Sequence, residues 1–286
     1  MIFIQQKQHI KNGRSICIMK SKKIIVGGCS FTDYAMPEKA QPNPMSFKMW
    51  PAYIEGYNVI NTARCGSGNR KILSNVIQEV LKHDAKDIAY VIVAWTEWTR
   101  QDILTDNSHF TDSPWRTVIP KIDDARDKLV KDIPHNETFV DEWYKSIQSK
   151  FPKDKDIQND TLQMMYLLQC FCKEQGINFL QFQMLPPYNK FRKEDQSLDE
   201  EISTKIEFGK RKQRELDFMK NPISLLLDES KFLGFPIWKG LGGYSMYQLL
   251  VKKYGHMDYR INGIDAHPNE DAHRFIAEVV LKNLDL

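Results

Sequence analysis

Residues 87–94 (DIAYVIVA) are the run of sequence that most restricts the fold. The run is short, continuous and apolar, which is typical of a strand covered on both faces and not of a strand with one face in water. A β-branched run at residues 22–26, which ends at Gly27 and Gly28, and a shorter run at residues 57–61 predict two further strands. We therefore expect a sheet whose strands are buried by helices.

Helical patterns alternate with these strands. Residues 70–83 carry apolar side chains on one face of an amphipathic helix, and residues 137–151, 156–175 and 269–284 predict further helices. Gly176 is expected to stop the third of them, and residues 177–185 (INFLQFQML) predict a fourth strand. Alternating strands and helices indicate parallel pairing with right-handed crossovers, so the predicted class is α/β with a doubly wound, mostly parallel sheet.

Two stretches, at about 98–135 and 188–245, interrupt this alternation at the carboxyl ends of strands. Residues 98–135 contain Pro114, Pro120 and Pro134. Residues 188–232 are highly charged and lead into a glycine-rich loop at 232–247. We interpret both as insertions, with the basic run at 205–214 as a solvated helix face. Residues 45–54 have roughly helical spacing interrupted by Pro51. The predicted organisation is an N-terminal arm at 1–19 and a single domain at 20–286.

Composition excludes several classes of function. A chain of 286 residues that is 42% hydrophobic can bury a full core in one domain. The net charge of +3, from 40 basic and 37 acidic residues that are mixed along the chain, does not favour nucleic-acid binding. Five cysteines without regular spacing indicate a reducing compartment. Without an 18-residue apolar run or a signal peptide we expect no membrane span and a cytoplasmic location, with release by lysis or in a virion left open. The oligomeric state is also left open.

Ser30 stands in the turn after the first strand. In a parallel α/β sheet this edge is where ligands bind, so a serine there is well placed to act as a nucleophile. A second interpretation needs no chemistry: Ser30 and Asp33 form the S-x-x-D pattern of a capping box at the start of a helix. Cys29 offers a thiol nucleophile instead, but neighbouring residues at a strand end point in opposite directions, so we expect Cys29 to pack beneath the turn.

Asp265 and His267 lie just before the last predicted helix. A serine nucleophile needs a base, and the base works best when a third group fixes its tautomer. Residues two apart in an extended segment lie on the same side, so Asp265 can orient His267. A core or capping histidine is the alternative. A metal site formed with Asp271 and His273 is not favoured, because Pro268 separates the two pairs and His273 falls near the polar side of the helix.

These motifs, in this order, resemble the SGNH (GDSL-type) esterase and lipase family. The matching blocks are Gly28-Cys29-Ser30-Phe31, residues 61–66 (NTARCG), residues 94–97 (AWTE) and residues 265–267 (DAH). The resemblance implies a three-layer α/β/α, flavodoxin-like fold and spans residues 22–284 apart from the insertions. It also implies that Ser30 is the nucleophile, His267 the base, Asp265 its orienting group and the backbone N–H of Gly66 an oxyanion donor.

The sequence departs from the family pattern at three positions. Cys29 stands where the family usually has aspartate, and the last block is Asp-x-His where Asp-x-x-His is usual. Thr96 replaces the asparagine of the third block, so the third oxyanion donor is expected to be either Thr96 or Asn69. A threonine hydroxyl can donate, although with a shorter reach.

The implied activity is that of a serine esterase that needs no metal or organic cofactor. It would hydrolyse an acyl ester, including an O-acetyl ester, of a carbohydrate or lipid through an acyl-enzyme on Ser30. A non-catalytic binding or assembly module and an acyltransferase are the alternatives. The candidates for lining the substrate site are Trp95, Trp98, Trp238 and Tyr244, although core or loop packing also explains each. Arg100 could recognise an anionic substrate, but we favour a surface salt bridge.

Overall fold

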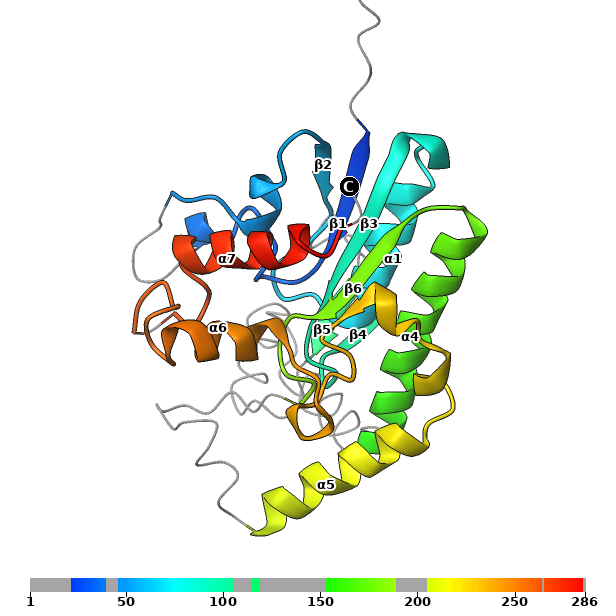
Figure 1. Cartoon of the computed structure of the whole chain (residues 1–286), viewed down its shortest axis with the longest axis vertical. Coiled ribbons are helices and arrows are strands. Elements are labelled where there is room, and N and C mark those ends of the chain that lie inside the picture. Colours follow the sequence, from blue (N-terminus) through cyan, green and yellow to red (C-terminus); the bar gives the residue numbers. More distant parts are fainter. Residues whose placement is uncertain are drawn as a thin grey trace, which may run out of the picture.

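A five-stranded sheet forms the centre of the fold (Figure 1). The computed structural model describes residues 22–39, 46–104, 115–118, 153–188, 205–263 and 265–284. All neighbouring strands of the sheet pair in parallel, in the order β2-β1-β3-β6-β7. Their bounds are β1 (Lys23–Gly27), β2 (Asn58–Asn61), β3 (Ile88–Trp95), β6 (Phe179–Gln183) and β7 (Phe232–Leu233). This is the flavodoxin-like order of a doubly wound sheet, which confirms the predicted fold class.

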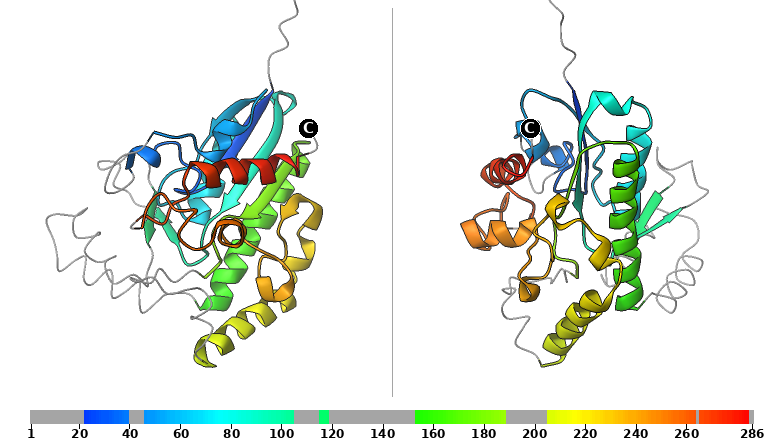
Figure 2. Two further views of the ribbon diagram at one scale, coloured as in Figure 1. Left: turned by 60° about the vertical axis from the view of Figure 1, so that its left-hand side comes forward. Right: turned by 45° about the vertical axis from the view of Figure 1, so that its right-hand side comes forward.

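Helices cover the sheet on both faces. The described α-helices are α1 (Asn69–Val80), α4 (Asp154–Glu174), α5 (Lys205–Lys220), α6 (Met246–Tyr254) and α7 (Glu270–Leu281). Helix α1 packs on β1, β3 and α4, whereas α6 and α7 lie on the opposite side of the sheet (Figure 2). The result is three layers. Within the described residues, no helix is both long enough and apolar enough to cross a membrane.

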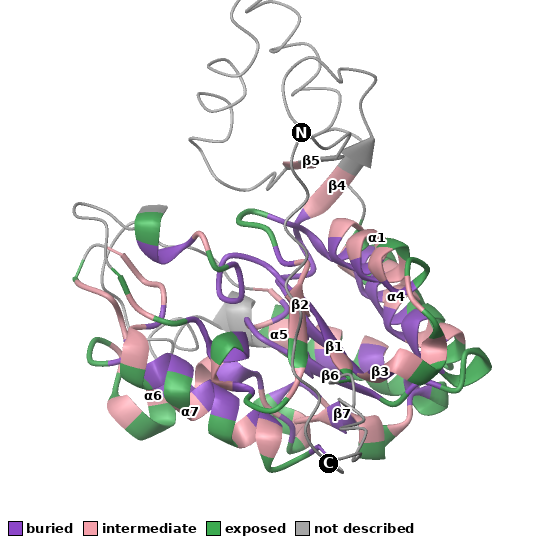
Figure 3. Cartoon of the chain, turned by 90° about the horizontal axis from the view of Figure 1, so that it is seen from above, coloured by how far each residue is buried: buried purple, intermediate pink, exposed green. Residues whose placement is uncertain are grey.

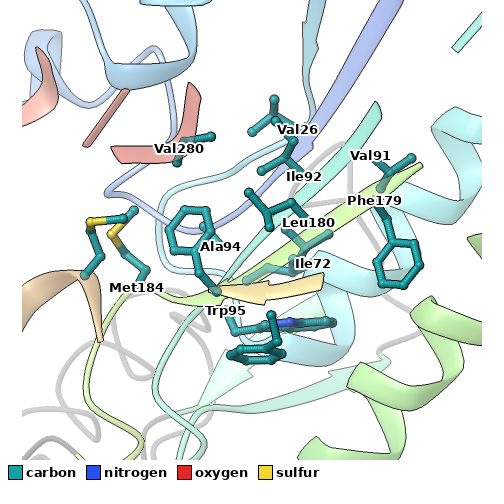
Figure 4. Close-up of a cluster of buried hydrophobic side chains, with 14 of the residues drawn as sticks. Val26, Ile72, Val91, Ile92, Ala94, Trp95, Phe179, Leu180, Met184 and Val280 are labelled. Atoms are coloured by element: carbon teal, nitrogen blue, oxygen red, sulfur yellow. The ribbon is translucent and has the colours of Figure 1, made fainter. Parts of the chain in front are cut away.

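The core lies between these layers, and buried residues follow the strands through the middle of the molecule (Figure 3). Every residue of β3 except Ala89 is buried, which is the expected consequence of its continuous apolar sequence. Val26, Ile92 and Leu180 come from three adjacent strands, with Ile72 of α1 and Val280 of α7 among the surrounding side chains (Figure 4). The sheet is therefore covered along its length.

Strand register brings the segments that follow β1 and β3 to one edge of the sheet. Gly27, the last residue of β1, pairs with Val93, two residues before the end of β3. A Cβ at Gly27 would lie 2.3 Å from Cγ2 of Val76, so the glycine allows α1 to pack closely on the strand. The turn after Gly27 and the residues after Trp95 thus leave the sheet as neighbours.

A short antiparallel hairpin follows β3 and caps α1. It pairs β4 (Gln101–Leu104) with β5 (Trp115–Val118). The carboxylate of Asp102 accepts hydrogen bonds from the backbone N–H groups of Gly68, at 3.0 Å, and Lys71, at 2.7 Å. The hydroxyl of Thr117 donates to the same carboxylate at 2.5 Å. Asp102 therefore satisfies two of the unpaired donors at the start of α1, a role that its sequence position did not indicate.

The described ends of α4 and α7 lie where the sequence signals predict them. Gly176 has φ of 65° just after α4, which confirms it as the helix stop. Asn269 caps α7 by accepting from the N–H of Ala272 at 3.0 Å, and Glu270 and Asp271 occupy the first turn. The positive end of the helix dipole stabilises acidic side chains at this position.

The structure corrects three local predictions. No helix begins at Ser30, so the capping-box interpretation is wrong: residues 30–32 form a turn and only a 3-10 turn at Pro37–Lys39 follows. Of the predicted stretch 45–54, the described residues 46–54 contain one short 3-10 turn, Trp50–Tyr53, with Pro51 near its start. The glycine-rich stretch 232–247 is not only a loop, since it contains β7 and the start of α6.

Several predictions fall outside the described residues. They are the arm at 1–19, the helix at 137–151, most of the insertion at 98–135, and residues 189–204 of the second insertion. The single-domain organisation at 20–286 stays a prediction.

Candidate active site

Ser30 lies in a tight turn at the carboxyl end of β1. The carbonyl of Cys29 accepts from the N–H groups of Thr32, at 2.9 Å, and Asp33, at 3.1 Å, which folds the chain back immediately after the strand. Cys29 is fully buried and packs in the core, as predicted, whereas Ser30 is 4% exposed and its hydroxyl meets His267. The turn thus separates the thiol from the hydroxyl.

The loop after β2 is tied to this turn by hydrogen bonds. The N–H of Arg64 donates to the carbonyl of Gly28 at 3.3 Å, and the amide of Asn61 donates to the carbonyl of Thr32 at 2.6 Å. Asp33 makes the connection closest to Gly66: its buried carboxylate accepts from the N–H of Cys65 at 2.7 Å. The turn that carries Ser30 and the loop that carries Gly66 are therefore held together.

Two backbone donors of these loops remain available. Gly66 is exposed and has φ of 76°, a conformation that favours glycine. Within the described part of the chain, the backbone N–H groups of Ser30 and Gly66 donate to no protein acceptor. Each can therefore donate to an oxygen atom of a bound ligand.

Asp265 and His267 belong to a segment that is pinned before α7. The N–H of Ile261 donates to the carbonyl of His267 at 2.8 Å, and the N–H of Asn269 donates to the carbonyl of Tyr259 at 2.7 Å. The N–H of Asp265 in turn donates to the side-chain oxygen of Asn262 at 2.7 Å. These bonds fix the position of the imidazole relative to the start of the helix.

The structure brings Ser30, His267 and Asp265 into one hydrogen-bonded chain. Nε2 of His267 lies 2.8 Å from Oγ of Ser30, and Nδ1 lies 2.5 Å from Oδ1 of Asp265. An ionised carboxylate can only accept, so Nδ1 carries the proton and Nε2 is left to accept from the serine hydroxyl. The ring of Phe31 packs against the imidazole, with centroids 5.0 Å apart. This arrangement can take a proton from Ser30.

Thr96 and Asn69 lie near this edge and are hydrogen-bonded to each other, and Thr96 is also hydrogen-bonded to Glu97. The Asn69 amide accepts from the N–H of Thr96 at 2.9 Å and donates to its carbonyl at 3.3 Å. The Thr96 hydroxyl donates to Glu97 at 3.1 Å, and the Thr96 side chain is fully buried. Both residues therefore link the start of α1 to the end of β3.

Arg100 forms a buried ion pair and not a surface salt bridge. It is 7% exposed, and its Nε donates to the carboxylate of Glu97, which is 1% exposed. Burial alone would lower the pKa of Arg100, but interactions with Glu97, Cys29 and Cys65 outweigh it and raise the pKa above its usual value. The guanidinium is thus a permanent positive charge that is buried and paired with Glu97.

The aromatic candidates serve mainly as packing. Trp95 and Trp98 are buried, and their indole N–H groups donate to Gln181 and Gln183, both at 3.0 Å. Trp238 is buried against Trp98, at 5.1 Å between centroids, and against neighbouring rings. Tyr244 is half-buried beside Gly234, and burial raises its pKa.

His273 differs from its prediction. It does not lie on the polar side of α7 but is fully buried, with its ring 5.8 Å from that of Phe47. Burial first, and then the nearby His267, lower the pKa of His273 to about 3, so its imidazole is neutral. Among the described residues no group of three or more His, Cys, Asp and Glu side chains is arranged to hold a metal ion.

Two features of the site and one helix escaped the sequence. Asp33 had a motif but was assigned to a helix cap, and the pairing of its carboxylate with Cys65 required knowledge of the loop after β2. Arg100 was expected to form a surface salt bridge, and neither its pairing with Glu97, three residues before it, nor the burial of the pair was predicted. Helix α6 did have a signal, because Ser245 and Gln248 form the S-x-x-Q capping box observed at its start.

Comparison with known proteins adds little to this site. No model of a known protein family matches the chain, and no curated protein sequence matches it. The crystal structure of the protein YxiM from Bacillus subtilis is similar to this chain with a TM-score of 0.38 and 14% sequence identity. The match covers 93% of this chain and 56% of the YxiM chain. The chain thus corresponds to about half of that protein's length, and functional conclusions rest on the geometry described above.

Proposed function

We propose that the protein is a serine esterase of the SGNH type that cleaves acyl esters through an acyl-enzyme on Ser30. The observation that supports this most strongly is the chain of two hydrogen bonds from Ser30 through His267 to Asp265. A buried helix-cap serine or a core histidine would not require it. The unpaired N–H groups of Ser30 and Gly66 are suited to the negative charge that develops on the ester oxygen.

In this proposal Oγ of Ser30 attacks the ester carbonyl carbon while its proton passes to Nε2 of His267. The carbonyl oxygen becomes an oxyanion that accepts from the two backbone N–H groups. The intermediate then collapses, and the leaving alcohol takes the proton from His267. Water, activated by the same histidine, hydrolyses the acyl-enzyme. The substrate class is an acyl ester, including O-acetyl esters, of a carbohydrate or lipid.

Hydrolysis of p-nitrophenyl acetate tests this function. The wild type should release p-nitrophenol, and Ser30→Ala and His267→Ala should each reduce kcat by about 10³-fold or more. Cys29→Ser is the matched control, because it alters the neighbouring nucleophile without touching the hydrogen-bonded chain. A non-catalytic binding module would show no turnover above buffer. If acyl groups appear on an added alcohol and not on water, the protein is instead an acyltransferase.

A further inference from the structure

Asn61 joins the two loops that carry the proposed oxyanion donors. It is the last residue of β2, and its partner in the neighbouring strand β1 is Val26. Its side chain reaches the turn after β1, where Nδ2 donates to the carbonyl of Thr32 at 2.6 Å. Oδ1 of the same amide accepts from the N–H of Ala63, in its own loop, at 3.0 Å. One side chain therefore holds its own loop and the turn that carries Ser30.

Asp33 makes the reciprocal connection. It lies in the turn after β1, and its Oδ2 accepts from the N–H of Cys65, in the loop after β2, at 2.7 Å. Asn61 and Asp33 thus form a clamp in which each loop sends one side chain to the backbone of the other loop. A backbone bond, from the N–H of Arg64 to the carbonyl of Gly28, adds to this clamp at 3.3 Å.

The clamped atoms lie close to both donors along the chain. Thr32 follows Ser30 by two residues, and Cys65 immediately precedes Gly66. A shift of one loop against the other therefore moves the N–H of Ser30 relative to the N–H of Gly66. Donors to an oxyanion must lie about 2.7–3.1 Å from one and the same oxygen atom, so such a shift weakens their joint action.

The turn that carries Ser30 does not depend on Asn61 for its own shape. The N–H groups of Thr32 and Asp33 both donate to the carbonyl of Cys29. On the side-chain level, the indole N–H of Trp50 donates to the Thr32 hydroxyl at 3.1 Å. Loss of the Asn61 amide should therefore leave the turn formed but less firmly held against the loop after β2.

We propose that Asn61 is a positioning residue that, together with Asp33, sets the spacing between the N–H groups of Ser30 and Gly66 for a single oxyanion. This inference rests on the proposed esterase function. Asn61 acts through the two backbone donors and contacts no reacting atom. Its amide neither gains nor loses a proton during the reaction.

Steady-state kinetics of Asn61→Ser on p-nitrophenyl acetate test this role. A serine hydroxyl can still accept from the N–H two residues further on, but it is too short to reach the carbonyl of Thr32. We expect kcat to fall by about 10–10²-fold with little change in KM, because the misplaced donors act on charge that exists only in the transition state. Asn75→Ser is the matched control. The Asn75 amide donates to the carbonyl of Thr62 at 3.4 Å, but this bond does not join the two loops. Its kcat should equal that of the wild type.

Two further measurements separate positioning from a general structural role. A trifluoromethyl ketone forms a hemiketal oxyanion with Ser30 that needs the same two donors. Its inhibition constant should rise in Asn61→Ser by the factor by which kcat/KM falls. The acid limb of the pH profile of kcat/KM reports the catalytic base. This limb should stay at its wild-type position, because the substitution does not touch the contacts of His267, and a shifted limb would contradict the proposal.

Stability is measured in parallel by urea unfolding. Asn61→Ala also loses the bond to Ala63, so it should unfold at a lower urea concentration than Asn61→Ser, with a loss of kcat at least as large. Wild-type kcat in folded Asn61→Ser contradicts the proposal. A loss of kcat confined to Asn61→Ala also contradicts it, since the loss would then arise within the loop after β2. A wild-type protein that neither hydrolyses the ester nor reacts at Ser30 contradicts the esterase function itself, whatever the Asn61 variants do.

Discussion

Nε2 of His267 lies 2.8 Å from Oγ of Ser30, although 237 positions separate the two residues in the sequence. Two separate local structures, one at each end of the chain, create this contact. The turn after β1 presents Ser30, and the Asn269 cap of α7, together with the bonds to Tyr259 and Ile261, fixes the segment that carries His267. Because each of these structures is held by local bonds, substitutions in one of them test the site without disturbing the other.

Asp265→Asn should reduce kcat on p-nitrophenyl acetate by roughly 10²–10⁴-fold, with a small change in KM. The amide cannot hold the imidazole tautomer in which Nδ1 carries the proton, so Nε2 no longer accepts from Ser30. Asp271→Asn, an exposed acid in the first turn of α7, is the control and should retain activity. Equal activities of the two variants would show that Asp265 does not orient the base.

Asp33→Asn should lower both stability and activity. The carboxylate accepts from the N–H groups of Ala35 and Cys65, and an amide offers one oxygen for these two donors. We expect a loss of about 1–3 kcal/mol in the free energy of unfolding, measured in urea. A lower kcat should accompany it, because the Gly66 loop loses its connection to the Ser30 turn. An unchanged kcat would limit Asp33 to a structural role. Asp84→Asn, on the exposed surface, should change neither quantity.

Gly66→Ala and Gly176→Ala form a matched pair. Both glycines have positive φ, 76° and 65°, and a Cβ at either would meet no atom within 4 Å. Each substitution should therefore destabilise the fold by about 1–2 kcal/mol through backbone strain alone. Only Gly66→Ala should lower kcat, since Gly176 ends α4 away from Ser30. Equal kcat values for the two variants would argue against a role for the Gly66 N–H.

His273 should make the fold sensitive to acid. Its pKa is about 3 in the folded protein and about 6.5 for an ordinary histidine, so between these values the unfolded chain binds a proton that the folded protein excludes. This contribution to stability is complete above about pH 6.5 and is lost as the pH falls toward 3, at up to about 1.4 kcal/mol per pH unit. Urea unfolding between pH 7.5 and 4.5 measures the slope. His273→Leu, which cannot titrate, should lose less stability over this range than the wild type, and an equal loss would contradict the prediction.

The sheet was predictable from sequence because its strands are buried on both faces. Runs such as residues 87–94 are apolar throughout, and the helical period between them fixes the parallel topology. Helix α6 was missed although its capping box was a signal, whereas strand β7 was missed for a physical reason. β7 has only two residues, Phe232 and Leu233, and is held by pairing with β6, which no local pattern reveals.

The site was predictable only where it follows motifs. Ser30 and His267 occupy positions that the resemblance singles out, and their contact agrees with that expectation. Burial was the property that sequence could not supply. Arg100 and Glu97 have the composition of a surface pair, and His273 has the spacing of a polar helix face, but all three are buried in the fold, with the ring of Phe47 beside that of His273.

Reaction with a fluorophosphonate, followed by peptide mass spectrometry, tests the central claim most directly. A serine activated by His267 should form a covalent phosphonyl adduct on Ser30, at a rate that falls strongly in His267→Ala, and Ser30→Ala should take up no label. An unlabelled Ser30 in the folded wild-type protein, or labelling at an equal rate in His267→Ala, would contradict it.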